Sequence, residues 1–226
     1  MRRTRVSFFD KLGRSFSAPR PVEIDPKIKT DADWLWRVTW LRGIGYGVLY
    51  QSGGDEFQAH LVSTRDGIKY QLVTTFEIAG RPNETTLRFL PTGEMVACVR
   101  RERETQNGFI GSSPPPYKVW TWKEQTMRLG GPNFVVLPND KMLGTTRVHL
   151  ADGKTRTAVV WLTRDGVINP ILTLPSAGDN SYAGMVVRGD KLLISYYASH
   201  EGKTAIYLAT LNLKRLLSEA ATGVGH

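Results

Sequence analysis

The side chains that most often carry enzyme chemistry are few in this sequence and widely spread. The single cysteine, Cys98, lies in the apolar run 95–99, where a small buried residue is a simpler interpretation than a nucleophile. The pairs His149–Asp152 and His200–Glu201 lack the spacing of a known metal site. No Gly-rich phosphate loop and no Ser/His/Asp motif stands out. We therefore expect no metal and no cofactor, which leaves arginine, tyrosine and carboxylate side chains as candidates.

Basic residues outnumber acidic ones, and the formal net charge is +9. Residues 1–20 supply +5 of this, from six basic residues against Asp10, so the remaining chain carries only +4. Nucleic-acid binding requires a basic face with a recognisable motif, and the sequence shows none. A small anionic substrate requires only two or three arginines. The charge therefore argues against a nucleic-acid partner and weakly favours an anionic small molecule.

A repeated hairpin indicates the scaffold that positions these residues. Copies lie at 36–52, 85–101, 132–148 and 182–198. Aligning their turns places Gly45, Glu94, Lys141 and Lys191 at one position, so the spacings are 49, 47 and 50 residues. A period near fifty with short strands is typical of a β-propeller, in which each twisted sheet buries its faces against neighbouring blades. The sequence therefore predicts an all-β propeller.

Further hairpins and one helix complete the units. Outer hairpins are expected at 60–73 and 157–174, each around a Thr-Arg-Asp-Gly turn, and residues 5–22 look like another outer hairpin without its inner pair. We expect one domain over 1–226, with about four and a half blades, and a C-terminal helix at 213–222 packed on it. Because an open arc leaves strand edges exposed, we expect missing N-terminal blades, through truncation or a mis-assigned start, or closure through a partner.

Several stretches resemble the sialidase and sialidase-like family of six-bladed propellers. They are Trp34–Trp40, Pro82–Phe89, Gly130–Phe134 and Ser195–Gly202. The segments 63–70 and 163–168 are similar to worn Asp-box (BNR) turns, the blade marker of that family, with Tyr70 in place of the usual tryptophan. The resemblance implies a glycoside hydrolase with a carbohydrate substrate. The family holds a sugar carboxylate with arginines, attacks with a tyrosine that a glutamate activates, and protonates the leaving group with an aspartate.

The resemblance also implies roles for particular residues. Tyr182, at the start of an inner strand, corresponds to the nucleophile, and Glu84 to its base. Arg100 lies 16 residues after Glu84, as the second arginine of the family does. Arg147 shares the repeat position of Arg100 one blade later, so both should point toward the axis. Three further residues are substrate-binding candidates: Arg101, which a one-residue register error would exchange with Arg100; Arg37, placed between two tryptophans; and Asn133.

The match is incomplete at the remaining functional positions. The first arginine and the acid/base aspartate of the family have no convincing counterpart, because Asp31, Asp33 and Asp55 stand at turn-like positions. The hypothesis is an exo-glycosidase that acts on a terminal, anionic sugar and is inactive as this chain if the site is incomplete. One alternative is a non-catalytic propeller that binds glycans or proteins through a rim of Trp34, Trp36, Trp40, Trp120 and Trp122. Another, ranked lower, is a hydrolase of neutral or uronic sugars that uses paired carboxylates.

The sequence contains no signal for a membrane. No run of about 18 apolar residues is present, and the N-terminus lacks an apolar signal-peptide core. We expect a soluble protein, and the compartment stays open, as does the oligomeric state.

Overall fold

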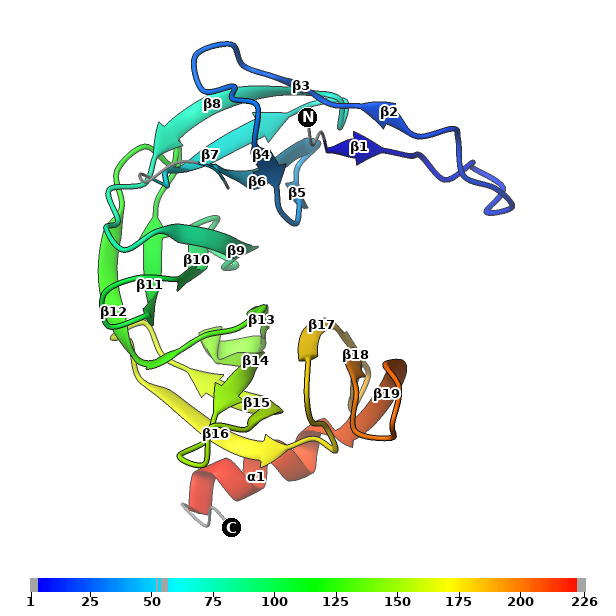
Figure 1. Ribbon diagram of the computed structural model, residues 1–226, viewed down its shortest axis with the longest axis vertical. Helices are drawn as coiled ribbons and strands as arrows, with labels where there is room; N and C mark the ends of the chain where they lie inside the picture. Colours follow the sequence, from blue (N-terminus) through cyan, green and yellow to red (C-terminus); the bar gives the residue numbers. More distant parts are fainter. Residues whose placement is uncertain (1–3, 52, 54–56, 223–226) are drawn as a thin grey trace.

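The computed structural model describes residues 4–51, 53 and 57–222, and its sheets follow one another along an arc (Figure 1). The first sheet contains β4 (Asp33–Leu35), β5 (Thr39–Leu41), β6 (Ile44–Gln51), β7 (Ala59–Thr64) and β8 (Lys69–Thr75), with β3 (Glu23–Ile24) parallel to β8. The second contains β9 (Pro82–Phe89), β10 (Met95–Arg101), β11 (Asn107–Ser113) and β12 (Thr121–Arg128). Every other pairing in these two sheets is antiparallel.

The second half of the arc repeats the pattern. The third sheet contains β13 (Asn133–Val136), β14 (Met142–His149), β15 (Thr155–Leu162) and β16 (Ile168–Thr173), with the 3-10 turn η1 (Pro138–Asp140) between its first two strands. The fourth contains β17 (Asn180–Arg188), β18 (Lys191–Ala198) and β19 (Ala205–Asn212), followed by α1 (Leu213–Thr222). The hairpin of β1 (Arg5–Val6) and β2 (Arg20–Pro21) extends from the other end of the arc (Figure 1).

This arrangement confirms the all-β propeller and its repeated hairpins. Each predicted inner hairpin is a strand pair around its turn, and the inner strands of successive sheets contact one another. The short C-terminal helix is also confirmed. The total of six blades in a closed propeller stays a prediction.

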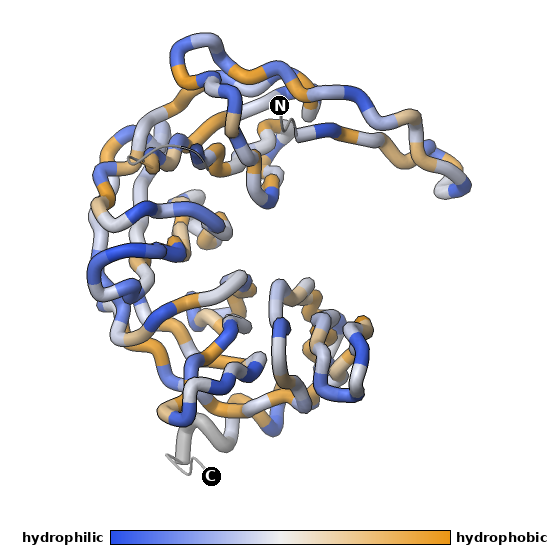
Figure 2. The backbone as a smooth tube through the Cα atoms, in the orientation of Figure 1, coloured by the Kyte–Doolittle hydropathy of each residue, from blue (hydrophilic) through white to orange (hydrophobic). Residues whose placement is uncertain are grey.

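Most of the hydrophobic core of the described residues lies in the seams between blades, and a further cluster around Leu49 and Val62 packs the first sheet against the segment that precedes it. One cluster joins Val96 and Ile110 of the second sheet to Phe134 and Val160 of the third. Other clusters fill the neighbouring seams, and in one of these Leu213 and Leu216 of α1 pack on the last two blades. Each large side chain fully buried in this way contributes about 1.5–3 kcal/mol. Figure 2 shows apolar segments along the strands and hydrophilic residues at many turns, as seam packing requires.

The Thr-Arg-Asp-Gly turns act as rigid corners of the outer hairpins. The Thr64 hydroxyl accepts hydrogen bonds from the Asp66 and Gly67 amides, and the Asp66 carboxylate accepts those of Ile68 and Lys69. Gly67 has a φ of +72°, which favours glycine. The turn is thus a structural feature of the blade, and it lies away from the arginine, tyrosine and glutamate candidates.

The tryptophans of the expected aromatic rim separate into different environments. Trp120 and Trp122 stack at 4.9 Å and both contact Phe76, so they belong to the packing between the first two blades. Trp36 packs on the Tyr182 ring. Trp34 and Trp40 are exposed, at 43% and 51%. Five tryptophans therefore do not form one binding rim.

Two kinds of feature are absent from residues 4–51, 53 and 57–222. In these ranges no helix has the length and apolar character to span a membrane. The same part of the chain holds no group of three His, Cys, Asp or Glu side chains arranged for a metal ion.

Candidate active site

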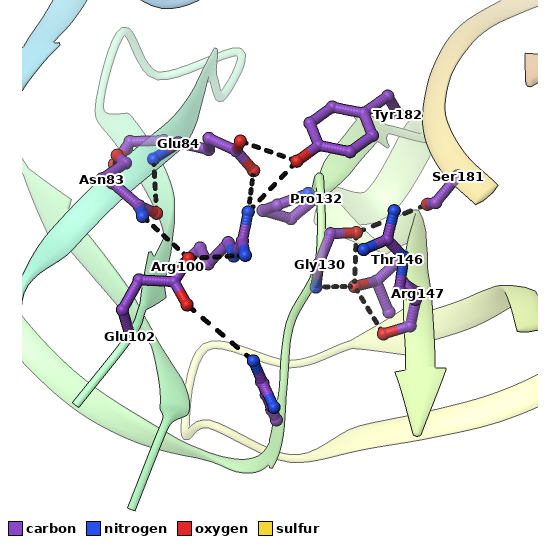
Figure 3. A network of polar contacts seen from close by, with 12 residues as sticks. Asn83, Glu84, Arg100, Glu102, Gly130, Pro132, Thr146, Arg147, Ser181 and Tyr182 are labelled. Atoms are coloured by element: carbon purple, nitrogen blue, oxygen red, sulfur yellow. Dashed lines mark hydrogen bonds and ion pairs between the residues drawn. The ribbon is translucent and has the colours of Figure 1, made fainter. Parts of the chain in front are cut away.

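Tyr182 and Glu84 meet where the inner strands of two different blades begin. The Tyr182 hydroxyl donates to Oε1 of Glu84 at 2.8 Å, although the residues are 98 positions apart (Figure 3). Glu84 on β9 is only 8% exposed. Because strands β9 and β17 belong to the second and fourth sheets, only the curvature of the arc brings these two side chains together.

An unusual backbone conformation aims the phenol. Ser181 and Tyr182 have φ values of +91° and +52°, and the register of β17 with β18 shifts between Ser181 and Gly184. Left-handed conformations of non-glycine residues cost about 1–3 kcal/mol each and persist where surrounding contacts fix them. Gly131, with a φ of +57°, lies against the ring: a Cβ there would be 2.9 Å from Cγ of Tyr182. A bulge and a glycine therefore set the ring position.

Arg100 connects the two members of the pair. Its Nη1 donates to Oε2 of Glu84 at 2.7 Å and to the Tyr182 hydroxyl at 3.1 Å. Its Nη2 lies 2.5 Å from Oε1 of Glu102. A guanidinium in this position stabilises negative charge on either oxygen of the Tyr182–Glu84 pair.

Arg147 approaches the same tyrosine from the third sheet. Its guanidinium lies over the Tyr182 ring at 5.6 Å from the centroid. Nε and Nη2 contact the Asn180 carbonyl, and Nη2 also contacts Asp179 at 2.6 Å and Tyr197 at 3.4 Å. Its Nη1 makes no hydrogen bond within the part of the chain that the structure describes. The structure thus brings Arg100 and Arg147, which share a repeat position, to one phenol.

Burial raises the pKa of the Tyr182 phenol above its usual range. The Glu84 carboxylate, through its charge and its hydrogen bond, raises this pKa further, whereas the guanidinium groups of Arg100 and Arg147 act in the opposite direction. The phenol is therefore neutral near pH 7, and it can become a nucleophile when its proton moves to Glu84 during attack.

Arg37 and Asn133 contact the backbone behind the phenol. Arg37 donates from Nη1 to the Ala183 carbonyl at 2.9 Å and from Nη2 to the Tyr182 carbonyl at 3.2 Å. Asn133 is 3% exposed, and its Nδ2 donates to the Ala183 carbonyl at 2.8 Å. Both expected substrate contacts are thus occupied by protein groups, although they lie at the site.

Arg101 is not brought to this site. Its side chain is 2% exposed and contacts the Asn107 carbonyl, Glu104, Thr105 and Glu124 within the second blade. Strand alternation explains the difference, because neighbours on β10 point to opposite faces and the register with β9 shifts between Val99 and Arg101. The expectation that Arg101 binds substrate is therefore corrected: Arg101 organises the 101–107 turn.

Sequence reasoning did not find several residues that complete the cluster. Glu102 accepts from Asn83 Nδ2 at 3.0 Å as well as from Arg100, and lies 3.8 Å from Arg128. Tyr197 stacks on Tyr182 with centroids 5.9 Å apart. The sequence does contain a signal for Glu102: it lies two residues after Arg100, and residues two apart in an extended chain point to the same side.

Of the three aspartates considered as acid/base candidates, the two that the structure describes, Asp31 and Asp33, contribute no contact to this cluster. Asp31 is exposed, and Asp33 accepts hydrogen bonds from Thr30. Asp55 lies outside the described residues.

Solved structures of other proteins have a fold similar to that of this chain. No protein-family profile and no curated protein matches the sequence. Among solved structures, a Dyadobacter fermentans DSM 18053 protein of unknown function is similar, with a TM-score of 0.75 and 18% identity over 92% of this chain and 63% of the other. The β-1,2-mannobiose phosphorylase of Listeria innocua has a TM-score of 0.59 and 14% identity over 83% of this chain and 61% of its own.

A third similar structure is CoXyl43, a GH43 β-xylosidase/α-arabinofuranosidase from a compost microbial metagenome. It has a TM-score of 0.58 and 11% identity over 94% of this chain and 80% of its own. The chain spans less than two thirds of the first two structures. At these identities the likeness establishes the fold, which glycoside hydrolases and phosphorylases of known structure share with this chain. A closer likeness to sialidases is not shown.

Proposed function

We propose that this chain is the catalytic part of a sialidase-like exo-glycosidase, with Tyr182 as nucleophile and Glu84 as its base. The observation that carries the proposal is the 2.8 Å hydrogen bond from the Tyr182 hydroxyl to Glu84, with Arg100 in contact with both. A nucleophile, its base and a cation that stabilises the developing charge are the parts that covalent catalysis by a phenol requires. Sialidases are the glycosidases known to use a tyrosine in this way.

The proposed reaction has two steps. In the first, the Tyr182 oxygen bonds to the anomeric carbon, the glycosidic C–O bond breaks with its electron pair on the leaving oxygen, and the phenol proton moves to Glu84. In the second, water attacks the same carbon, the bond to Tyr182 breaks, and Glu84 returns its proton to the phenol oxygen, while the attacking water releases one proton to the solvent, which balances the leaving group that departed as an anion. A neutral phenol suits an anionic sugar, because a carboxylate beside the reacting carbon repels an anionic nucleophile.

The preference for an anionic sugar rests on the charge around Tyr182. Arg100 and Arg147 both contact its side chain, and Arg37 lies behind it. The Nη1 group of Arg147 is the nitrogen of this guanidinium available to a substrate carboxylate, because Nε and Nη2 bond to Asn180 and Asp179 and Nη1 bonds to none of the described residues.

A panel of 4-methylumbelliferyl glycosides tests the proposal. An α-sialoside, a β-glucuronide, a β-mannoside and a β-xyloside differ in the charge and type of sugar, and this leaving group departs without protonation, so the assay requires no general acid. We expect the α-sialoside to be cleaved, Tyr182→Phe to abolish its turnover and Glu84→Gln to lower it by about 10²–10⁴-fold. Tyr207→Phe is the matched control, because Tyr207 also bonds a carboxylate, Glu201, at 3.0 Å.

Four results would contradict the proposal in different ways. Turnover that survives Tyr182→Phe removes the tyrosine nucleophile. Cleavage of a neutral glycoside alone favours the carboxylate-based hydrolase, and a rate that rises with inorganic phosphate favours a phosphorylase, the activity of the Listeria structure. Glycan binding without turnover, unchanged in Tyr182→Phe, supports the non-catalytic propeller, for which the exposed Trp34 and Trp40 are the aromatic candidates.

A further inference from the structure

The peptide that carries the Tyr182 side chain lies at an irregularity of its own sheet. Residues 182 and 183 fall between the two registered parts of the β17–β18 ladder, which shifts between Ser181 and Gly184. Tyr182 also has a left-handed φ of +52°. Regular strand pairing with β18 therefore does not determine the direction of its side chain, and other contacts have to do so.

Side chains from two other blades bond to two consecutive backbone carbonyl groups, those of Tyr182 and Ala183. Arg37, from the first blade, donates to both the Tyr182 and the Ala183 carbonyl oxygens. Asn133, from the third blade, donates to the Ala183 carbonyl at 2.8 Å. Two donors on one carbonyl and one on the other fix the orientation of the backbone behind the phenol.

Arg88, from the second blade, fixes the orientation of Asn133. Its Nη2 donates to Oδ1 of Asn133 at 2.7 Å, and the same oxygen accepts the Phe134 amide at 2.9 Å. With its oxygen held by two donors, the Asn133 amide must direct Nδ2 toward Ala183. Arg88 is itself held by the Thr39 hydroxyl and the Leu87 carbonyl.

We propose that Arg37, Asn133 and Arg88 are positioning residues that hold the backbone of Tyr182 and Ala183 and thereby keep the phenol on Glu84. The network takes one residue from each of three blades and acts on the fourth, so the geometry of the site depends on the curvature of the whole arc. The description of Tyr182 as a nucleophile rests on the proposed function, whereas the claim about its placement stands without turnover.

The charges of the network support a positioning role. Neither Arg37 nor Arg88 has a carboxylate within ion-pair distance among the described residues. Burial, and then the nearby Arg37 cation, lower the pKa of Arg88 to about 10. Two cations without ion-pair partners are poor contributors to stability, and their hydrogen bonds to the tyrosine-bearing peptide and to Asn133 account for their presence.

The experiment uses the phenol itself as the reporter. Tyrosinate absorbance is titrated in the chain and in its Tyr182→Phe variant, and the difference gives the ionisation of Tyr182. Each network substitution is made both in the chain and in the Tyr182→Phe background. The substitutions are Arg37→Lys, which keeps the cation but loses the planar fork that places Nη1 and Nη2 on two carbonyls, and Asn133→Ala. Arg164→Lys is the matched control, because Arg164 also joins two blades, through Glu94 and Ser112, away from the site. Thermal unfolding by circular dichroism shows whether each variant is folded.

We expect both network variants to move the Tyr182 midpoint to lower pH, because the released phenol loses its burial and its Glu84 contact, the main causes that raise its pKa. With an active parent, kcat should fall by about 10²-fold at nearly constant KM. Arg88→Gln should move the midpoint in the same direction by less, and Arg164→Lys should leave it unchanged. If one network variant fails to fold, the other one decides.

A Tyr182 midpoint that stays in place in the folded network variants overturns the inference. So does an equal shift in Arg164→Lys, because the effect would then be a general loosening of the blades. The two proposals fail separately. If the parent chain is inactive but the Tyr182 midpoint shifts in the network variants, the glycosidase proposal fails and the positioning network stands. If the chain shows Tyr182-dependent turnover that Arg37→Lys and Asn133→Ala leave unchanged, the positioning network fails and the glycosidase proposal stands.

Discussion

Replacing Gly131 by alanine should displace the Tyr182 ring while every catalytic candidate keeps its own side chain. The added Cβ would lie 2.9 Å from Cγ of Tyr182, whereas carbon atoms prefer at least about 3.5 Å, so the ring has to move by about 0.6 Å. Movement of that size away from Glu84 lengthens the 2.8 Å hydrogen bond to about 3.4 Å, beyond the range of a good O–H···O contact. We expect kcat to fall by about 10–10²-fold.

A matched control separates the strain of placing alanine in a left-handed backbone conformation from the effect of displacing the Tyr182 ring. Gly131 and Gly189 have φ values of +57° and +61°, but a Cβ at Gly189 meets no atom within 4 Å. Both alanine variants should lose about 1–2 kcal/mol in the free energy of unfolding from the left-handed conformation. Only Gly131→Ala should lower the Tyr182 ionisation midpoint and the turnover of the aryl sialoside. Equal behaviour of the two variants in both assays would refute the reasoning that ring position controls the site.

Three further predictions concern single residues. Glu84→Gln should move the Tyr182 midpoint to lower pH in the tyrosinate titration, because the charge and the hydrogen bond of Glu84 both raise that pKa; an upward shift would contradict the pairing. Arg101→Met should cost about 1–3 kcal/mol in urea unfolding, because it leaves the Asn107 and Ala79 carbonyls without their guanidinium donor, whereas the partly exposed carboxylates of Glu104 and Glu124 become solvated. Exposed Arg103→Met should change stability by less than about 0.5 kcal/mol. Burial lowers the pKa of His60 in the folded state, so as the pH falls the unfolded state binds a proton at His60 before the folded state does. The contribution of His60 to stability should be complete above about pH 6.5 and decline as the pH falls below it, and unfolding measured from pH 8 to 5 should show a weaker decline in His60→Gln.

The sequence alone was sufficient for the blade architecture. A hairpin that recurs about every fifty residues is a local pattern, and each copy contains the alternating apolar residues of strands and the residue types that form turns. The same repeat placed Arg100 and Arg147 at equivalent positions, and the structure has both at Tyr182. Glu84 and Tyr182 came from resemblance, and their contact agrees with the strand starts assigned to them.

Tertiary structure decided what each side chain contacts. The contacts of Arg100 and Arg101 separated the two candidates, because Arg100 bonds to Tyr182 whereas Arg101, after the register shift between Val99 and Arg101, bonds within its own blade. Arg37 and Asn133 were expected to bind substrate, yet they bond to the backbone of a distant blade, and Arg88 joins them. These contacts cross between blades far apart in sequence, so their geometry follows from the curvature with which the sheets pack. A periodic pattern fixes the repeating unit, whereas the angle between successive units arises only when their faces are packed together.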